Sequence, residues 1–221
     1  MCLTPATAAY ANAGVRLRIL GATHRYGFSL VVDPGKVKAP KDLERPEVRI
    51  ACLREGTASD LFLHRTVEKF GLSKVLIRRT RRMNPFLAIL AISRGEVDAA
   101  FLPEHWASLV EELGFKAILT AQQVWPDMPG SVIVIREEAL RRDPDLAEAL
   151  QRVNRRATLW INSHRFEATE LVRRALSIAE PKGASASPLP ALTRAVIERA
   201  MARLSYDDRS EGGPKDRRLP L

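Results

Sequence analysis

The sequence has few cysteines and no long apolar segment, and each shortage excludes a class of protein. Cys2 and Cys52 are its only cysteines, and neither belongs to a CxxC or Cys/His spacing. They therefore predict neither a metal site nor a disulfide framework. No segment reaches the ~18 consecutive apolar residues of a membrane-spanning helix. The first ten residues lack a positive start and a sustained apolar run, so we expect no secretory signal and no lipid anchor at Cys2.

Aromatic residues are also scarce, at 6% of the chain, and this bears on its positive charge. The 35 lysines and arginines outnumber the 26 acids and give a formal charge of +9. Such a balance suggests nucleic acid or a membrane surface as a partner. However, no aromatic-interleaved RNA motif or helix-turn-helix core accompanies the arginines. A solvated basic face is the favoured interpretation; its arginines include Arg141, Arg142, Arg152, Arg155, Arg156, Arg173 and Arg174.

The length and the order of apolar segments predict an α/β fold. At 221 residues and 46% hydrophobic content, the chain can form one large domain or two small α/β lobes. Strands and helices alternate, which is typical of a parallel sheet flanked by helices. Strands are expected at 15–20, 28–32, 48–52, 75–78, 97–102, 115–119 and 131–135.

The expected helices have recognisable starts and stops. Asn84 followed by Pro85 suits a helix start, and so does Asp143 followed by Pro144. A Gly, Ala and Ser stretch at 183–188 suggests a linker, and 206–221 suggests a disordered tail. Helices are expected from the turn at 56 to residue 70, at 84–95, at 103–113, after 143, from 163, and at 191–204.

The strongest candidate binding element is the turn at 56–59, which opens a helix. A helix N-terminus exposes unpaired N–H groups and a partial positive charge, so it favours anions. A glycine lets a ligand approach the backbone closely, and the hydroxyls add donors. The alternative is that a hydroxyl of this turn only caps the helix. The candidate ligand residues here are Gly56, Thr57, Ala58 and Ser59.

Further candidates follow other expected strands, each with a purely structural alternative. His24 could donate a hydrogen bond to a ligand or be a surface loop residue. Asn84 could contact ligand, but a helix cap is favoured. Trp106, next to Glu104 and His105, could line a cleft or pack in the core. Trp125 could cover a ligand from its loop. His64 and His164 have no metal-spaced partner, and no nucleophilic triad, paired-carboxylate signature or P-loop occurs.

Several short motifs, in order, resemble the solute-binding proteins of ABC importers for nitrate, bicarbonate, sulfonates, taurine and thiamine-precursor pyrimidines. The resemblance extends from about residue 5 to residue 175. The motifs are Gly-Ala-Thr-His-Arg-Tyr-Gly at 21–27, Pro-Lys-Asp-Leu at 40–43, Gly-Thr-Ala-Ser at 56–59, Ser-Arg-Gly-Glu-Val-Asp-Ala-Ala at 93–100, Pro-Glu-His-Trp-Ala-Ser at 103–108 and Thr-Leu-Trp-Ile-Asn at 158–162.

The resemblance implies a type II periplasmic-binding-protein fold with ligand held between two α/β lobes. Lobe two would be residues 42–122, and lobe one would combine 1–41 with 123–205. Thr4 and Pro5 would then lie near the cleft. Family members carry a strand, a helix and a second strand before the equivalent of Thr4, so lobe one is expected to be incomplete. Where they commonly have Glu-Pro, this chain has Glu104 and His105, which could alter the ligand.

A non-catalytic receptor is therefore the leading hypothesis. It would be an extracytoplasmic monomer without cofactor or metal, working with ABC permease subunits in the membrane. The alternative is a cytoplasmic enzyme on the same scaffold, in menaquinone or thiamine-precursor synthesis. A third hypothesis, the effector domain of a transcription regulator, would require a helix-turn-helix segment that this sequence lacks.

Overall fold

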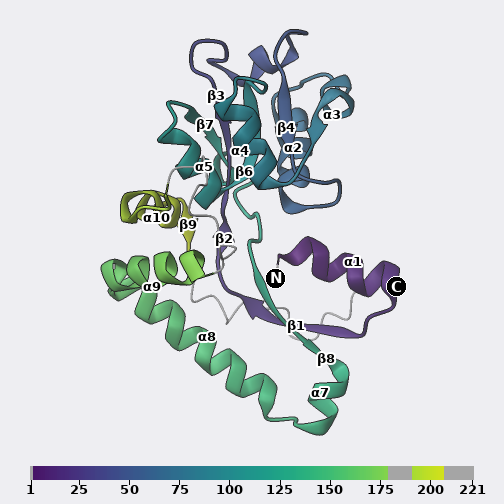
Figure 1. Ribbon diagram of the computed structural model, residues 1–221. Helices are drawn as coiled ribbons and strands as arrows, with labels where there is room; N and C mark the ends of the chain where they lie inside the picture. The colour runs from purple at the N-terminus through teal and green to yellow at the C-terminus, as the bar shows by residue number, and fades with distance from the viewer. Residues whose placement is uncertain (1, 179–190, 207–221) are drawn as a thin grey trace. The chain divides into compact units, whose positions relative to one another are not determined.

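The computed structural model describes residues 2–178 and 191–206 (Figure 1). The expected linker at 183–188 lies outside these residues, and so does the tail expected at 206–221 except for Tyr206. The chain divides into two compact units. Unit 1 contains residues Met1–Arg25, Pro129–Arg165 and Ser205–Leu221, and unit 2 contains Tyr26–Met128 and Phe166–Leu204. The short strands β2 (Arg25–Tyr26) and β9 (Leu204–Ser205) lie where the chain passes from one unit to the other.

Unit 2 is built on a five-stranded sheet with the order β5-β4-β6-β3-β7. β4 pairs in parallel with both β5 and β6, whereas β3 runs antiparallel to its neighbours β6 and β7. The register places Leu30 opposite both Phe101 and Leu119. The strands are β3 (Phe28–Val32), β4 (Ile50–Cys52), β5 (Arg81–Arg82), β6 (Ala99–Pro103) and β7 (Lys116–Thr120).

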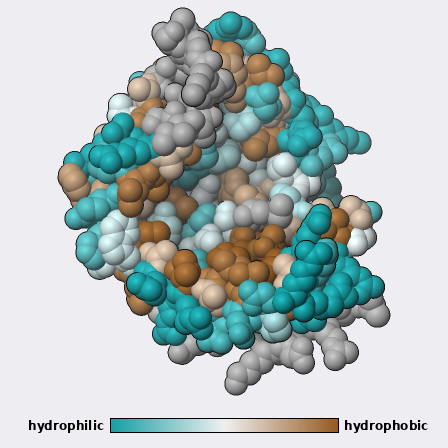
Figure 2. All heavy atoms as spheres, turned by 60° about the horizontal axis from the view of Figure 1, so that its bottom comes forward, coloured by the Kyte–Doolittle hydropathy of each residue, from teal (hydrophilic) through white to brown (hydrophobic). Residues whose placement is uncertain are grey.

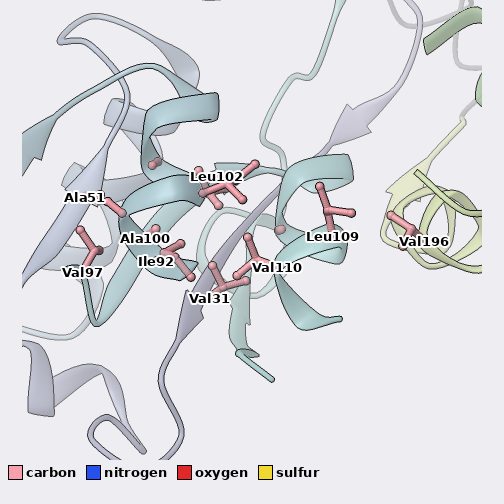
Figure 3. Close-up of a cluster of buried hydrophobic side chains, with 13 residues drawn as sticks. Val31, Ala51, Ile92, Val97, Ala100, Leu102, Leu109, Val110 and Val196 are labelled. Atoms are coloured by element: carbon pink, nitrogen blue, oxygen red, sulfur yellow. The ribbon is translucent and has the colours of Figure 1, made fainter. Parts of the chain in front are cut away.

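Helices cover this sheet and enclose a hydrophobic core (Figures 1 and 3). Val31, Ala100 and Leu102 from the sheet pack with Ile92 and Val110 from the helices, and all five are at most 2% exposed. The helices of unit 2 are η1 (Pro40–Glu44), α2 (Ala58–Lys69), α3 (Val75–Arg79), α4 (Pro85–Ser93), α5 (Glu104–Glu111), α6 (Ala121–Val124) and α10 (Arg194–Ala202), together with α9 (Arg165–Ile178) after its first residue.

The α/β fold class is confirmed, but the expectation of parallel sheets is corrected to a mixed sheet. All five residues of β3 are buried. A strand covered on both faces has a continuous apolar sequence whichever way it runs. The strand expected at 28–32 is therefore confirmed, but its composition contained no information on its direction.

The strand expected at 75–78 is wrong, because these residues form the helix α3. Leu72, Leu76 and Thr80 are buried at intervals of four, whereas Val75 is 52% exposed. Thr80 also donates its backbone N–H to the Leu76 carbonyl at 3.1 Å. A short apolar run in a sequence is compatible both with a strand and with a helix. Here the chain is buried on one side only, at the helical spacing, so it forms a helix.

Unit 1 contains a two-stranded antiparallel sheet, β1 (Leu17–Ala22) with β8 (Val132–Arg136). It also contains the helices α1 (Leu3–Ala13), α7 (Glu137–Arg142) and α8 (Leu146–Ser163). Gln151 and Asn154 of α8 donate side-chain hydrogen bonds to the carbonyls of Leu20 and Ala22 in β1, at 2.8 and 3.0 Å. These amides give two carbonyls of β1 a partner from α8.

Part of the apolar surface of unit 1 remains exposed. Ile19 is 46% exposed, Val153 62% and Leu159 51%. Figure 2 turns the lower elements of Figure 1 forward and shows hydrophobic side chains gathered on that face. A two-stranded sheet has little surface with which to cover apolar neighbours, which accounts for this exposure. Among the described helices, none is long and apolar enough to cross a membrane.

Two helix boundaries differ from expectation in this region. α8 begins at Leu146, whereas Asp143 was expected as the cap and Pro144 as the first helical residue. The N-cap residue is Asp145, which makes no side-chain capping bond. The Asp143 carboxylate instead accepts the N–H of Asp145 at 3.2 Å, within the turn between α7 and α8. α9 begins at Arg165 rather than Ser163.

The compact units also differ from the lobes expected at 42–122 and at 1–41 with 123–205. β3 lies before residue 42 but pairs with β6 and β7, so it belongs to the sheet of unit 2. α10 lies after residue 122 and packs against α5 in the same unit. Long-range strand pairing and helix packing, which adjacent residues do not encode, set these boundaries.

Candidate functional site

The sheet of unit 2 brings most of the candidate ligand residues to one edge. β4, β5, β6 and β7 all run in the same direction, as their pairings with one another and with β3 establish. Each is followed by a helix: α2, α4, α5 and α6, respectively. Since ligands of α/β sheets bind beyond the carboxyl ends of such strands, this edge is the candidate site. It carries the turn at 56–59, Asn84, Glu104, Trp106 and Trp125.

The turn at 56–59 opens the helix α2, as expected. Gly56 has a φ of +76°, a conformation that favours glycine, and Thr57 is the N-cap of α2. The Thr57 hydroxyl accepts the N–H of Asp60 at 3.4 Å and donates to the carbonyl of Arg54 at 2.7 Å. The capping alternative is therefore confirmed for Thr57.

The turn also carries a carboxylate of its own. Asp60, which is 5% exposed, accepts the N–H of Gly56 at 2.9 Å and forms an ion pair with Arg82 at 2.7 Å. Arg82 also donates to the Leu53 carbonyl at 3.1 Å. A solute at this turn therefore meets a neutralised Asp60–Arg82 pair, not a bare helix N-terminus.

The four residues of the turn differ in accessibility. Gly56 is exposed and Thr57 half-buried, whereas Ala58 is 6% exposed and Ser59 fully buried. Within the described residues, the Ser59 hydroxyl has no hydrogen-bond partner. Gly56 and Thr57 are therefore the parts of the turn that a solute can reach directly.

Asn84 has the structural role that the sequence favoured. Its side-chain oxygen accepts the N–H of Leu87 at 2.9 Å, which caps α4, and Pro85 occupies the first helical position. Met83 donates its N–H to the Cys52 carbonyl at 3.0 Å and so continues the pairing of β5 with β4.

Glu104 takes part in a buried ion-pair network. The carboxylate is 2% exposed and accepts hydrogen bonds from Ser29 at 2.7 Å and from Arg203 at 2.8 Å. Arg203 also contacts Glu111 at 2.9 Å. Burial raises the pKa of Glu104, while the hydrogen bonds from Arg203 and Ser29 oppose that shift. Each carboxylate oxygen thus accepts a hydrogen bond from the protein, which indicates a structural role for Glu104.

Trp106 and His105 lie beside the core. Trp106 is partly buried and packs against the hydrophobic cluster of unit 2, in agreement with the core alternative. The His105 ring lies 5.0 Å from the Trp106 ring, between centroids. Burial lowers the pKa of His105 to about 4.

This lowered pKa predicts that acid destabilises the protein through His105. Folding favours the neutral imidazole, so the stabilisation is complete above pH 6.5 and is lost as the pH falls towards about 4. Over that range the His105 contribution to the free energy of unfolding should fall by about 3 kcal/mol. Denaturant titrations of the wild type and His105→Gln across this range measure it. Parallel pH profiles of the two proteins would contradict the prediction.

Trp125 follows α6 at the same edge. The guanidinium of Arg65, from α2, lies 5.1 Å from the centroid of its ring, within the range of a cation–π interaction. Lys69 of α2 also donates to the Gln123 carbonyl. Contacts from α2 therefore hold the Trp125 segment beside the helix that the 56–59 turn opens.

The remaining candidates belong to unit 1. Thr4 and Pro5 lie in the first turn of α1, where Pro5 is exposed and the Thr4 carbonyl accepts the hydroxyl of Thr7 at 2.9 Å. His24 follows β1, and its ring packs against Gly130. Burial lowers the pKa of His24. The Tyr206 ring lies 6.2 Å from the His24 ring, between centroids.

Four residues of the ion-pair and hydrogen-bond networks, Asp60, Arg82, Ser29 and Arg203, were not expected from the sequence. Asp60 could have been, because a carboxylate three residues after an N-cap threonine is a capping signal. No local signal indicates the partners Arg82, Ser29 or Arg203, because each contact joins distant segments. The described part of the chain contains no group of three or more His, Cys, Asp or Glu residues that could hold a metal ion.

Comparisons with known proteins agree with this architecture. A model of the NMT1-like family matches residues 1–177. The aliphatic sulphonate binding protein SsuA of Escherichia coli has a similar structure, with a TM-score of 0.73, 18% identity, and coverage of 92% of this chain and 64% of SsuA. A zinc-bound ligand-binding component of an ABC-type import system from Staphylococcus aureus gives a TM-score of 0.72, 16% identity, and coverage of 94% and 66%.

The periplasmic nitrate-binding protein NrtA of Synechocystis is also similar. It gives a TM-score of 0.63 and 15% identity, with 77% of this chain and 48% of NrtA covered. At such identities the likeness establishes the fold. The chain spans less than two thirds of the length of SsuA and of NrtA and about two thirds of the staphylococcal protein. No curated protein matches the sequence significantly.

Proposed function

Since the chain belongs to the NMT1-like family, we propose that it is the solute-binding component of an ABC-type importer. Structural neighbours named as binding proteins for sulphonate and nitrate support this assignment. The proposed solute is a small anionic or polar molecule, such as nitrate, a sulfonate, bicarbonate or a pyrimidine. The proposed partner is an ABC permease, with the receptor acting outside the cytoplasm as a monomer.

The observation that carries the proposal is the gathering of helix starts and polar groups at the carboxyl edge of the unit 2 sheet. The exposed Gly56 turn, the neutralised Asp60–Arg82 pair and Trp125 together offer backbone, polar groups and an aromatic surface. In the proposed mechanism the two units act as the two lobes. Thr4, Pro5 and His24 of unit 1 would add contacts that stabilise a closed form.

A thermal-shift panel of the full chain tests the proposal. Because a solute that binds only the folded state stabilises it by RT ln(1 + [L]/Kd), a hundredfold excess over Kd adds about 2.7 kcal/mol. Nitrate, sulfonates, bicarbonate and pyrimidines are the probes. We expect one class to raise the melting temperature and to be recovered chemically unchanged. No response to any probe, or recovery of a converted product, would overturn the receptor assignment.

The role of the turn is tested by Gly56→Ala with Gly71→Ala as its matched control. Both glycines have positive φ and open space where a methyl would lie, so each variant should lose about 1 kcal/mol of unfolding free energy. Gly56 lies at the proposed site, whereas Gly71 follows α2 at its other end. Gly56→Ala alone should weaken binding of the responding solute, by about tenfold.

Calorimetric titration of both variants measures this difference. Equal affinities for the two variants would remove the turn from the binding site.

A further inference from the structure

A second concave site lies in unit 2, between the edge strand β5 and the helix α4. Its cavity volume is about 330 Å³, which is within the range of small-molecule sites. One wall is formed by residues 81–83 of the strand segment. The other is formed by α4 and the residues just after it.

The charged groups of this groove are mostly positive. Arg81, Arg82 and Arg94 line it, with Glu96 as the one acid in the lining. Arg94 is exposed and forms no ion pair with a described residue, and the Arg81 side chain donates to the Glu96 backbone carbonyl at 3.4 Å. Arg82 pairs with Asp60 through one nitrogen, while its Nη2 is buried without a hydrogen-bond partner among the described residues. That nitrogen is inaccessible, so an anion in the groove would meet the exposed guanidiniums of Arg94 and Arg81, which can form charge-assisted hydrogen bonds with it.

The remaining lining is apolar. Leu87, Leu90 and Ala91 lie on one face of α4, at the i, i+3 and i+4 spacing, and Arg94 continues that face one turn later. Leu87 is 50% exposed. The face thus presents an apolar strip that ends in a guanidinium.

We propose that this groove binds an amphiphilic anion: a short alkyl chain that lies along α4 and carries an acidic head group at Arg94 and Arg81. The positive lining complements the head group, and the leucines cover the chain. Arg82 belongs both to this lining and to the Asp60 pair beside the 56–59 turn, whereas Arg94, Leu87 and Leu90 take no part in that turn.

Calorimetric titration of the full chain with octanoate tests the proposal, with acetate and octanol as partial probes. Octanoate is expected to bind at one site, and neither partial probe should bind measurably at the same concentration. Arg94→Gln should weaken octanoate binding about tenfold, through loss of a charge-assisted contact. Leu87→Ser should weaken it about fivefold, through loss of apolar contact. Both side chains are exposed, so both variants should fold.

Arg78→Gln is the matched control, because Arg78 is an exposed arginine of unit 2 that does not line the groove. It should bind octanoate like the wild type, and so should Gly56→Ala. Equal affinity in wild type, Arg94→Gln and Leu87→Ser would overturn the proposal, as would binding of octanol as tight as that of octanoate. Loss of octanoate binding in Gly56→Ala would assign the ligand to the transport site instead.

Discussion

Replacing Arg203 by methionine is expected to lower the free energy of unfolding by about 3–5 kcal/mol, because it leaves a buried carboxylate without its counter-charge. Glu104 is 2% exposed, and Arg203 is its only basic partner among the described residues. Arg203 also contacts Glu111, which keeps a longer ion pair with Arg199 at 3.8 Å, so the main loss falls on Glu104. Methionine keeps the aliphatic part of the side chain, so the loss reports mainly on charge.

Urea unfolding of Arg203→Met measures this effect against Arg142→Ala. Arg142 forms an exposed pair with Glu138, and such pairs contribute less than about 1 kcal/mol. Adding Glu104→Gln to Arg203→Met should recover part of the loss, since the unpaired charge is then gone. If Arg203→Met lowers the free energy of unfolding no more than Arg142→Ala does, the network does not stabilise the packing of α10 on α5.

Replacing Gly130 by alanine is expected to destabilise unit 1 by about 2–3 kcal/mol, by overpacking. A Cβ at this position would overlap the imidazole of His24 and lie 2.6 Å from the His24 carbonyl oxygen. The ring could rotate away, but the carbonyl is backbone and accepts the Gly130 N–H at 3.1 Å. Either response moves His24, a proposed ligand residue.

Gly21→Ala provides the control for this variant. Gly21 lies in β1 of the same unit, and a Cβ there would meet no atom within 4 Å. Its unfolding free energy should stay within about 0.5 kcal/mol of the wild type. Thermal unfolding of the two variants separates the effects of steric overlap and of glycine loss. Similar melting temperatures for both would show that unit 1 absorbs the overlap without cost.

The sequence by itself determined the features that depend on neighbouring residues. The Asn84 cap and the strand at 28–32 both follow from local chemistry: a side chain that bonds three residues on, and a run of apolar residues. The ordered motifs also identified the family and the fold class correctly.

Only the tertiary structure decided the features that join distant segments. The direction of β3, the helical state of α3 and the partners of Asp60 and Glu104 each depend on residues remote in the chain. For the candidate site, the sequence located the helix starts but not the ion pairs that occupy them. The physical reason is that buried charge is stable only beside a counter-charge, and folding can recruit that counter-charge from any part of the chain.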